Sequence, residues 1–158
     1  MFSPRLLACV LALCITSAYA QQFTAGDIVV ERPWARATPK GASVGAGYMV
    51  VRNKGQAPDT LTGIASDIAA AAQMHETKSQ GGVMSMDEVA RLAIPPGGAV
   101  MFKPGAYHVM FVDLKAPLKK GEHFKATLTF EHAGPIAVDF AIEGIGASAP
   151  SMPGMDMK

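Results

Sequence analysis

Cysteine is nearly missing from this chain. Cys9 and Cys14 are the only two, and both lie in an N-terminal segment with the features of a secretory signal peptide. Removal of that segment leaves no thiol, which excludes a disulfide framework, a cysteine nucleophile, a CxxC redox pair and a thiolate metal site. Lipoprotein cleavage before Cys14 would need a small residue just ahead of it, and Leu13 is not small, so we do not expect a lipid anchor.

The signal-peptide segment covers residues 1–20. Arg5 is its single basic residue, residues 6–15 form an apolar run, and Ala18-Tyr19-Ala20 has the small-x-small form of a cleavage site. We therefore predict cleavage after Ala20 and export to the periplasm. The apolar run is too short to cross a bilayer as a helix, so we expect no membrane span after cleavage.

An excess of charge of either sign is also missing. The chain has 14 Lys and Arg against 13 Asp and Glu, and loss of Arg5 makes the two counts equal. A neutral chain gives no reason to expect nucleic acid or an anionic membrane surface as a partner. There is also no paired carboxylate cluster, no nucleophile beside a base and no three-histidine site, so we do not expect an enzyme.

The sequence does contain many short apolar segments separated by Gly and Pro. Its 158 residues suit one domain with a proper core. Alternation is clearest where Phe124, Ala126, Leu128 and Phe130 fall on one face. Short strands with such turns predict an all-β fold, a Greek-key β-sandwich or barrel. The predicted strands cover residues 28–31, 47–52, 60–66, 71–77, 83–89, 100–103, 108–114, 124–131 and 136–142.

Two stretches are less regular. The alanines of residues 66–72 could form one or two helical turns before Gln73. Residues 146–158 are rich in Gly, Ala, Ser, Pro and Met, and we expect a flexible tail there. The predicted organisation is a signal peptide over 1–20, a β-sandwich domain over 21–145 and the tail over 146–158.

Histidine and methionine gather in residues 74–110, a combination of imidazole and thioether that suits Cu(I). His108 and Met110 are one residue apart on a predicted strand, so both side chains should point to one face, with Val109 and Phe111 pointing into the sandwich. The pattern leaves a second interpretation open, in which Met110 is a core residue and His108 a surface one.

His75 follows Met74, and a regular strand places these two side chains on opposite faces; imidazole is the stronger ligand candidate. Met84 and Met86 share a strand face, and because both are thioethers their chemistry does not show which of them could bind the metal. Either could also be core filler, the commoner role of methionine.

The two remaining histidines, His123 and His132, have no second soft donor at a short fixed offset. We interpret both as surface residues.

The chain resembles the PCu(A)C family of exported copper chaperones. The family signature is His, ten residues, Met, twenty-one residues, His, one residue, Met, and here His75, Met86, His108 and Met110 match it at every spacing. Further segments resemble the family in the same order. These are residues 33–38, 45–48 with Asn53, 94–98, and 114–118 with Gly121, so the resemblance covers residues 27–142.

The resemblance implies a cupredoxin-like β-sandwich that holds one Cu(I) per chain near its surface through these four residues. It thereby selects Met86 over Met84. It also implies ligand exchange with a thiolate-bearing acceptor, the cytochrome c oxidase subunit with the CuA site or its assembly factor. We expect a monomer.

Two features depart from the family. Members often have a basic residue after the ligand methionine, whereas this chain has Asp87-Glu88, so the charge near the metal should differ. Some members carry His and Met in the tail; here Met152, Met155 and Met157 are present without histidine, which allows a further Cu(I) contact and argues against a Cu(II) site.

Three rival functions are compatible with a β-sandwich fold. A blue-copper electron carrier needs a cysteine thiolate, which the exported chain lacks. A periplasmic copper buffering or resistance protein would use the same site for storage. A binding module of the β-sandwich type, with methionines in its core, would bind no metal.

Overall fold

The computed structural model describes residues 21–151, all as strands and connecting loops without a helix. The predicted signal peptide and the tail methionines Met152, Met155 and Met157 lie outside these residues. No helix within 21–151 is long and apolar enough to cross a membrane. The strands are β1 (Gln22–Ala25), β2 (Ile28–Arg36), β3 (Val44–Asn53), β4 (Asp59–Ala65), β5 (Ala69–Gln80), β6 (Val83–Glu88), β7 (Leu92–Ile94), β8 (Ala99–Phe102), β9 (Tyr107–Leu114), β10 (His123–Phe130) and β11 (Gly134–Glu143).

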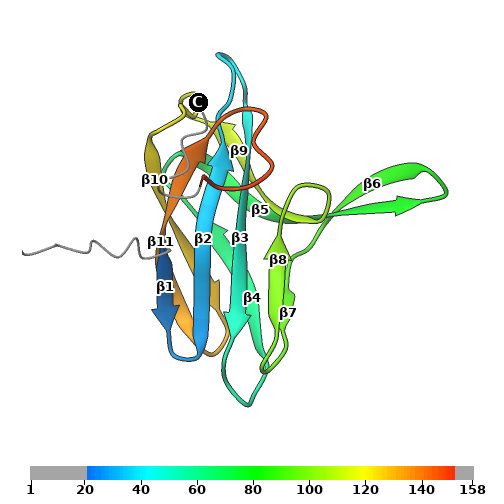
Figure 1. The fold of residues 1–158 in the computed structure, drawn as a ribbon, viewed down its shortest axis with the longest axis vertical. Helices are drawn as coiled ribbons and strands as arrows, with labels where there is room; N and C mark the ends of the chain where they lie inside the picture. The colour runs from blue at the N-terminus through cyan, green and yellow to red at the C-terminus, as the bar shows by residue number, and fades with distance from the viewer. Residues whose placement is uncertain (1–20, 152–158) are drawn as a thin grey trace, which may run out of the picture.

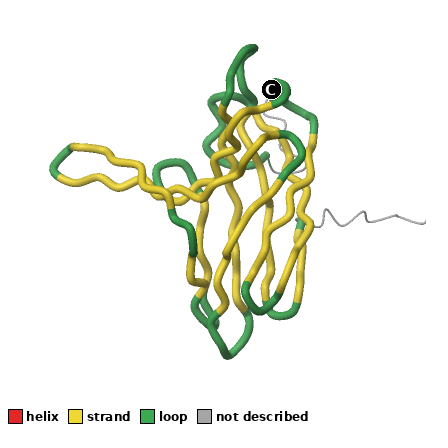
Figure 2. The backbone as a smooth tube through the Cα atoms, turned by 180° about the vertical axis from the view of Figure 1, so that it is seen from behind, coloured by secondary structure: helices red, strands yellow, loops and turns green. Residues whose placement is uncertain are grey.

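The strands form one continuous sheet in the order β6-β5-β9-β8-β3-β2-β11-β10-β4-β7, with β1 beside β2. An additional pairing between β4 and β5 closes this sheet into a barrel, as Figures 1 and 2 show. Most neighbours are antiparallel, but β11 runs parallel to β2 and β8 runs parallel to β9. The fold is therefore the predicted all-β, cupredoxin-like barrel.

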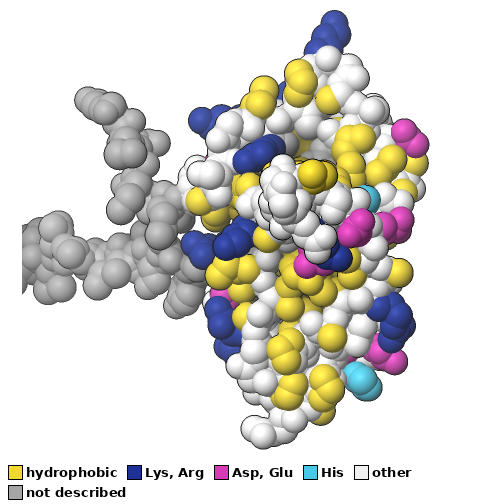
Figure 3. Space-filling model, turned by 90° about the vertical axis from the view of Figure 1, so that its right-hand side faces the viewer, with side chains coloured by type: hydrophobic (Ala, Val, Ile, Leu, Met, Phe, Trp, Pro, Cys, Tyr) yellow, Lys and Arg dark blue, Asp and Glu magenta, His cyan; other side chains and the backbone are white. Residues whose placement is uncertain are grey.

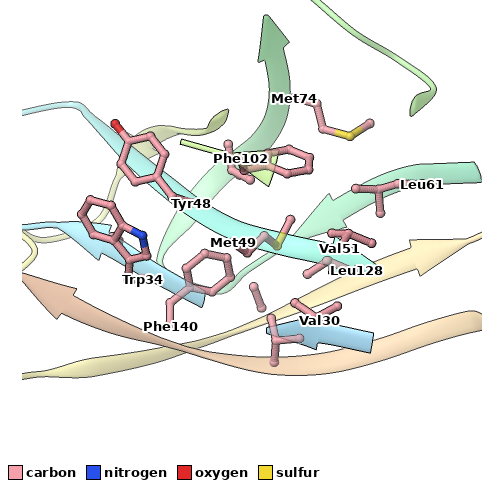
Figure 4. Close-up of a cluster of buried hydrophobic side chains, with 14 of the residues drawn as sticks. Val30, Trp34, Tyr48, Met49, Val51, Leu61, Met74, Phe102, Leu128 and Phe140 are labelled. Atoms are coloured by element: carbon pink, nitrogen blue, oxygen red, sulfur yellow. The ribbon is translucent and has the colours of Figure 1, made fainter. Parts of the chain in front are cut away.

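Aromatic side chains fill the barrel interior. Phe140 of β11 stacks on Phe124 of β10 with ring centroids 5.2 Å apart, and Phe111 of β9 meets both rings edge-on. Phe111 and Phe140 have no solvent exposure. Offset and edge-to-face contacts of this kind are the favoured aromatic geometries. Figure 4 shows Phe140 within the buried cluster, with Met74 of β5 pointing into it from another wall.

The observed strands are more numerous than predicted, and several of them are longer. β1 and β7 were not predicted, because four and three residues are too few to show an alternation. β2 continues past Pro33 through a break in its pairing with β3 between Glu31 and Trp34, where Arg32 has φ 46°. Such a bulge accommodates a proline, which has no N–H to donate.

The helical alternative for residues 66–72 was wrong. Ala69 begins β5, and the strand pairs with β9 from Ala69 onward. Pairing to β9 outweighs the helix propensity of four alanines, because the tertiary context overrides a preference of a few tenths of a kcal/mol per residue.

One hairpin leaves the barrel. The end of β5 and the whole of β6 project outward as a two-stranded arm (Figures 1 and 2). Gly81 and Gly82 form its turn with φ of 58° and 81°, the left-handed backbone that tight two-residue hairpin turns require. Every residue of β6 is exposed. We call β6 with the end of β5, residues 76–88, the arm.

Candidate metal centre

Strand pairing brings the two histidines of residues 74–110 side by side. His75 of β5 is the register partner of His108 of β9, and their rings stack with centroids 5.7 Å apart. Cross-strand partners project to the same face of a sheet. The two imidazoles, 33 positions apart in sequence, therefore lie next to each other on one face.

Met110 and Met86 project from this same face. Met110 lies two residues beyond His108 on β9, and Met86 of the arm pairs with Thr77, two residues beyond His75 on β5. Side chains two residues apart on a strand share a face. The register thus places all four predicted ligands on one side of the sheet.

The opposite side of the same strands belongs to the core. Met74 is 4% exposed and Val109 and Phe111 are fully buried, as the alternation predicted. The interpretation of Met110 as a core residue and His108 as a surface one was wrong, because Met110 is partly exposed and His108 is buried.

The arm distinguishes Met86 from Met84. Met84 pairs with Ser79, four residues from His75, whereas Met86 pairs with Thr77, two residues away. At a rise of about 3.3 Å per residue, the level of Met86 is about 7 Å from that of His75 and the level of Met84 about 13 Å. Met84 is 65% and Met86 53% exposed, so neither is core filler.

Hydrogen bonds leave one nitrogen of each ring available. Nδ1 of His108 lies 3.2 Å from the carbonyl oxygen of Ala106 and can donate to it. Nε2 of His75 lies 3.2 Å from Oε1 of Gln73. Metal-ligating histidines commonly use one nitrogen for such an acceptor and the other for the metal.

The remaining nitrogen of His75 is unusual. Its Nδ1 is the only buried side-chain nitrogen or oxygen of residues 21–151 without a hydrogen-bond partner. Native proteins seldom leave a buried polar atom unsatisfied, and a role in binding an ion is one of the recognised reasons for such an atom. A lone pair on this nitrogen, beside the ring of His108, is suited to bind a metal ion.

An open hollow borders the site. Its volume is about 260 Å³, and its lining includes His108, Met110, Thr77, Tyr48 and Arg36. Arg36 lies with its Cζ 5.7 Å from the centre of the Tyr48 ring. Figure 3 looks onto the side from which the arm projects and shows hydrophobic side chains exposed there, with acidic and basic ones beside them. Solvent, or a partner, can therefore reach the ligand face at the partly exposed Met110, whereas His108 beside it is buried.

The two acidic residues after Met86 point to different faces. Asp87 pairs with Glu76 on the far face, where Lys78 Nζ lies 3.3 Å from a carboxylate oxygen of each and its pKa is raised by these contacts. Glu88 pairs with His75 and so shares the ligand face. The expected difference in charge near the site therefore comes from Glu88 alone.

The other two histidines are on the surface, as predicted. His123 is half-exposed with Nδ1 3.2 Å from Asp139, and His132 is largely exposed with Nδ1 3.3 Å from Asp59. Within the described chain, no three His, Cys, Asp or Glu side chains are grouped as a metal site would need.

Sequence reasoning missed Gln73 and Arg36. Gln73 pairs with Met110 and touches His75, and Arg36 lines the hollow from β2. Gln73 could have been noticed, because it lies two residues before His75 on the same strand face. Arg36 carried no such signal, since only the pairing of β2 with β3 and of β3 with β9 brings it to the site.

Residues 28–142 match the family model of the LpqE-like lipoproteins. Among individual proteins, Lxx21020 of Leifsonia xyli subsp. xyli, which is named as a lipoprotein, is 32% identical over 117 residues. That match covers 72% of this chain and 69% of the relative.

Two solved structures resemble the fold closely. The copper-bound PCuAC domain from PmoF2 is 31% identical with a TM-score of 0.68, and covers 78% of this chain and 97% of its own. The Cu(I) form of DR1885 from Deinococcus radiodurans is 29% identical with a TM-score of 0.60, covering 80% of this chain and 83% of its own. With 31% and 29% identity, both structures are similar to this chain in sequence as well as in fold.

Proposed function

This chain belongs to the LpqE-like family of PCuAC-type proteins, and on that premise we propose that it is an exported chaperone for Cu(I). One cuprous ion per chain is held by His75, Met86, His108 and Met110. The observation that carries this proposal is the buried, unpartnered Nδ1 of His75 beside His108. The copper-bound and Cu(I) states named for the two structural relatives support the choice of metal.

The donor set explains the oxidation state. Two imidazoles and two thioethers are neutral, and soft sulfur favours Cu(I), whereas Cu(II) prefers tetragonal nitrogen and oxygen donors. The single carboxylate on this face, Glu88, would balance part of the positive charge of the ion.

The same donors favour release. An acceptor with cysteine thiolates offers softer, anionic ligands, so copper passes by ligand exchange, with the incoming sulfur replacing a thioether or imidazole. We propose the CuA site of cytochrome c oxidase, or its assembly factor, as that acceptor, and the periplasm, after cleavage following Ala20, as the place. Transfer moves the ion without a change of oxidation state.

The site is tested by Cu(I) titration of the exported chain under reducing conditions, followed by X-ray absorption. We expect one ion with two sulfur and two nitrogen neighbours. His75→Ala should weaken binding at least tenfold, whereas the matched control His123→Ala, which removes an exposed imidazole elsewhere, should not. A sulfur-free coordination shell, or equal affinity in both variants, would reject the site.

The acceptor is tested in cells that lack the protein. Delivery predicts low oxidase activity when copper is scarce, restored by the wild-type chain but not by His75→Ala. Buffering, the rival role for the same site, predicts instead poor survival under excess copper with normal oxidase activity.

A further inference from the structure

Gln73 occupies a special position beside the proposed ligands. It lies on β5 two residues before His75, and its register partner on β9 is Met110. Its side chain is therefore on the ligand face, where Oε1 lies 3.2 Å from Nε2 of His75. No other side chain of the described residues hydrogen-bonds to this ring.

This contact determines where the proton of the ring is held. A neutral imidazole has one N–H and one lone pair, and an amide oxygen only accepts. With the proton on Nε2, His75 donates to Gln73 and its lone pair is on Nδ1. The other tautomer would bury an N–H at Nδ1, where no acceptor exists, and would require Gln73 to turn its amide NH2 toward Nε2.

The neighbouring histidine has the reverse arrangement. Nδ1 of His108 faces the backbone carbonyl of Ala106, so its lone pair is on Nε2. A backbone acceptor persists through any side-chain substitution, whereas the acceptor for His75 depends on one residue. The two rings can therefore be changed independently.

We propose that Gln73 is a positioning residue that sets His75 to bind copper through Nδ1, while His108 binds through Nε2. The inference rests on the proposed copper site and adds the atom through which each ring coordinates. Partners of this kind fix the tautomer and orientation of a ligand histidine, and their loss commonly weakens metal affinity by about 10- to 100-fold.

The test begins without copper. In the full exported chain, labelled with nitrogen-15 at histidine and held at pH 8, where free imidazole is neutral, two-bond nitrogen–proton NMR correlations identify the protonated nitrogen of each ring. We expect the proton of His75 on Nε2 and that of His108 on Nδ1. A proton on Nδ1 of His75 would overturn the proposal, whatever the affinity for copper.

Variants then link the tautomer to binding. Gln73→Leu removes the acceptor at similar size and should give mixed tautomers at His75, an unchanged His108, and Cu(I) affinity reduced about tenfold. Gln73→Glu keeps an acceptor and should retain the Nε2–H tautomer. Gln80→Leu, at the exposed end of the same strand, is the matched control and should change neither measurement.

The outcomes separate this inference from the function it rests on. An unchanged tautomer and affinity in Gln73→Leu reject the role of Gln73 even if the wild type binds copper. A wild type that binds no Cu(I) rejects the proposed function. If Gln73→Leu does not fold, loss of the Nε2–H tautomer in the folded Gln73→Glu variant overturns the proposal, and its retention supports it.

Discussion

At the scale of single residues, the site depends on which side chains face solvent from the same side of β5, β6 and β9. Met84 and Met86 make a natural pair for comparison, because they lie on the same strand face and are both more than half exposed. They differ in their distance along β5 from His75. That difference is the basis of the first prediction.

Met86→Ala should weaken Cu(I) binding about tenfold or more, while Met84→Ala should leave the affinity within about twofold of the wild type. Because both substitutions are on the surface, each should alter the free energy of unfolding by less than about 0.5 kcal/mol. Competition with a Cu(I) chelator measures the first quantity and urea denaturation the second. Equal weakening by the two variants would mean that the arm does not place Met86 selectively.

A second residue-scale prediction concerns Asp59, far from the metal face. Its carboxylate is 6% exposed and accepts the backbone N–H groups of Thr60, His132 and Ala133 at 2.7, 2.9 and 2.9 Å. Burial alone would raise its pKa, but these bonds and the contact with the His132 ring outweigh it, so the pKa is lowered.

A carboxyl with a lowered pKa stabilises the fold above its unfolded-state value, about 3.9, and loses that contribution as the pH falls through the folded value. Asp59→Asn turns one acceptor into a donor and should cost about 1–3 kcal/mol at pH 7. Urea denaturation at pH 7 and pH 3 should show the difference between variant and wild type shrinking at the lower pH. A constant difference would contradict this account.

At the scale of elements, β6 pairs with no described strand except β5, so the arm projects from the barrel as a hairpin. The turn residues Gly81 and Gly82 have positive φ, and a Cβ at either position would meet nothing within 4 Å. Substitution there is therefore opposed by backbone conformation and not by space. An L-residue in this conformation costs about 1–2 kcal/mol.

Gly82→Val should loosen the arm, accelerate amide hydrogen exchange in β6 and reduce Cu(I) affinity severalfold through Met86. Global stability should change little, because the arm contributes nothing to the core. Gly63→Ala is the control, since its Cβ meets no atom and its φ is not positive. Unchanged exchange in β6 would show that the turn does not organise the arm.

At the scale of the whole molecule, the core supports the metal face from behind. Phe111 directly follows Met110 on β9 and points into the core, where its ring centroid lies 5.7 Å from that of Phe140. Phe140→Ala should destabilise the protein by about 3–5 kcal/mol through the cavity it leaves. One Cu(I) per chain should still bind below the melting temperature, as thermal unfolding with and without the ion can show. Loss of binding in the folded variant would mean that packing behind β9 positions the ligands.

Much of this architecture was predictable from alternation. The two-residue spacing correctly indicates the inward-pointing residues of β10, which are Phe124, Ala126, Leu128 and Phe130. The same strand period predicts that Met74 and His75 lie on opposite faces of β5. The pairing of His75 with His108 is a long-range register that no local pattern encodes, so the ligand set came from a family resemblance. The strand period places Gln73 on the same face as His75, but it does not predict the hydrogen bond between them, which depends on side-chain orientation.

The arm also allows the metal preference of this protein to be changed by substitution. Because β6 is exposed along its whole length, a new donor at position 86 would require no repacking of the interior. Three of the proposed donors lie on β5 and β9 in the barrel wall, and the fourth, Met86, lies on β6. Proteins built in this way could shift between soft and borderline metals by a single codon change while the scaffold stays constant.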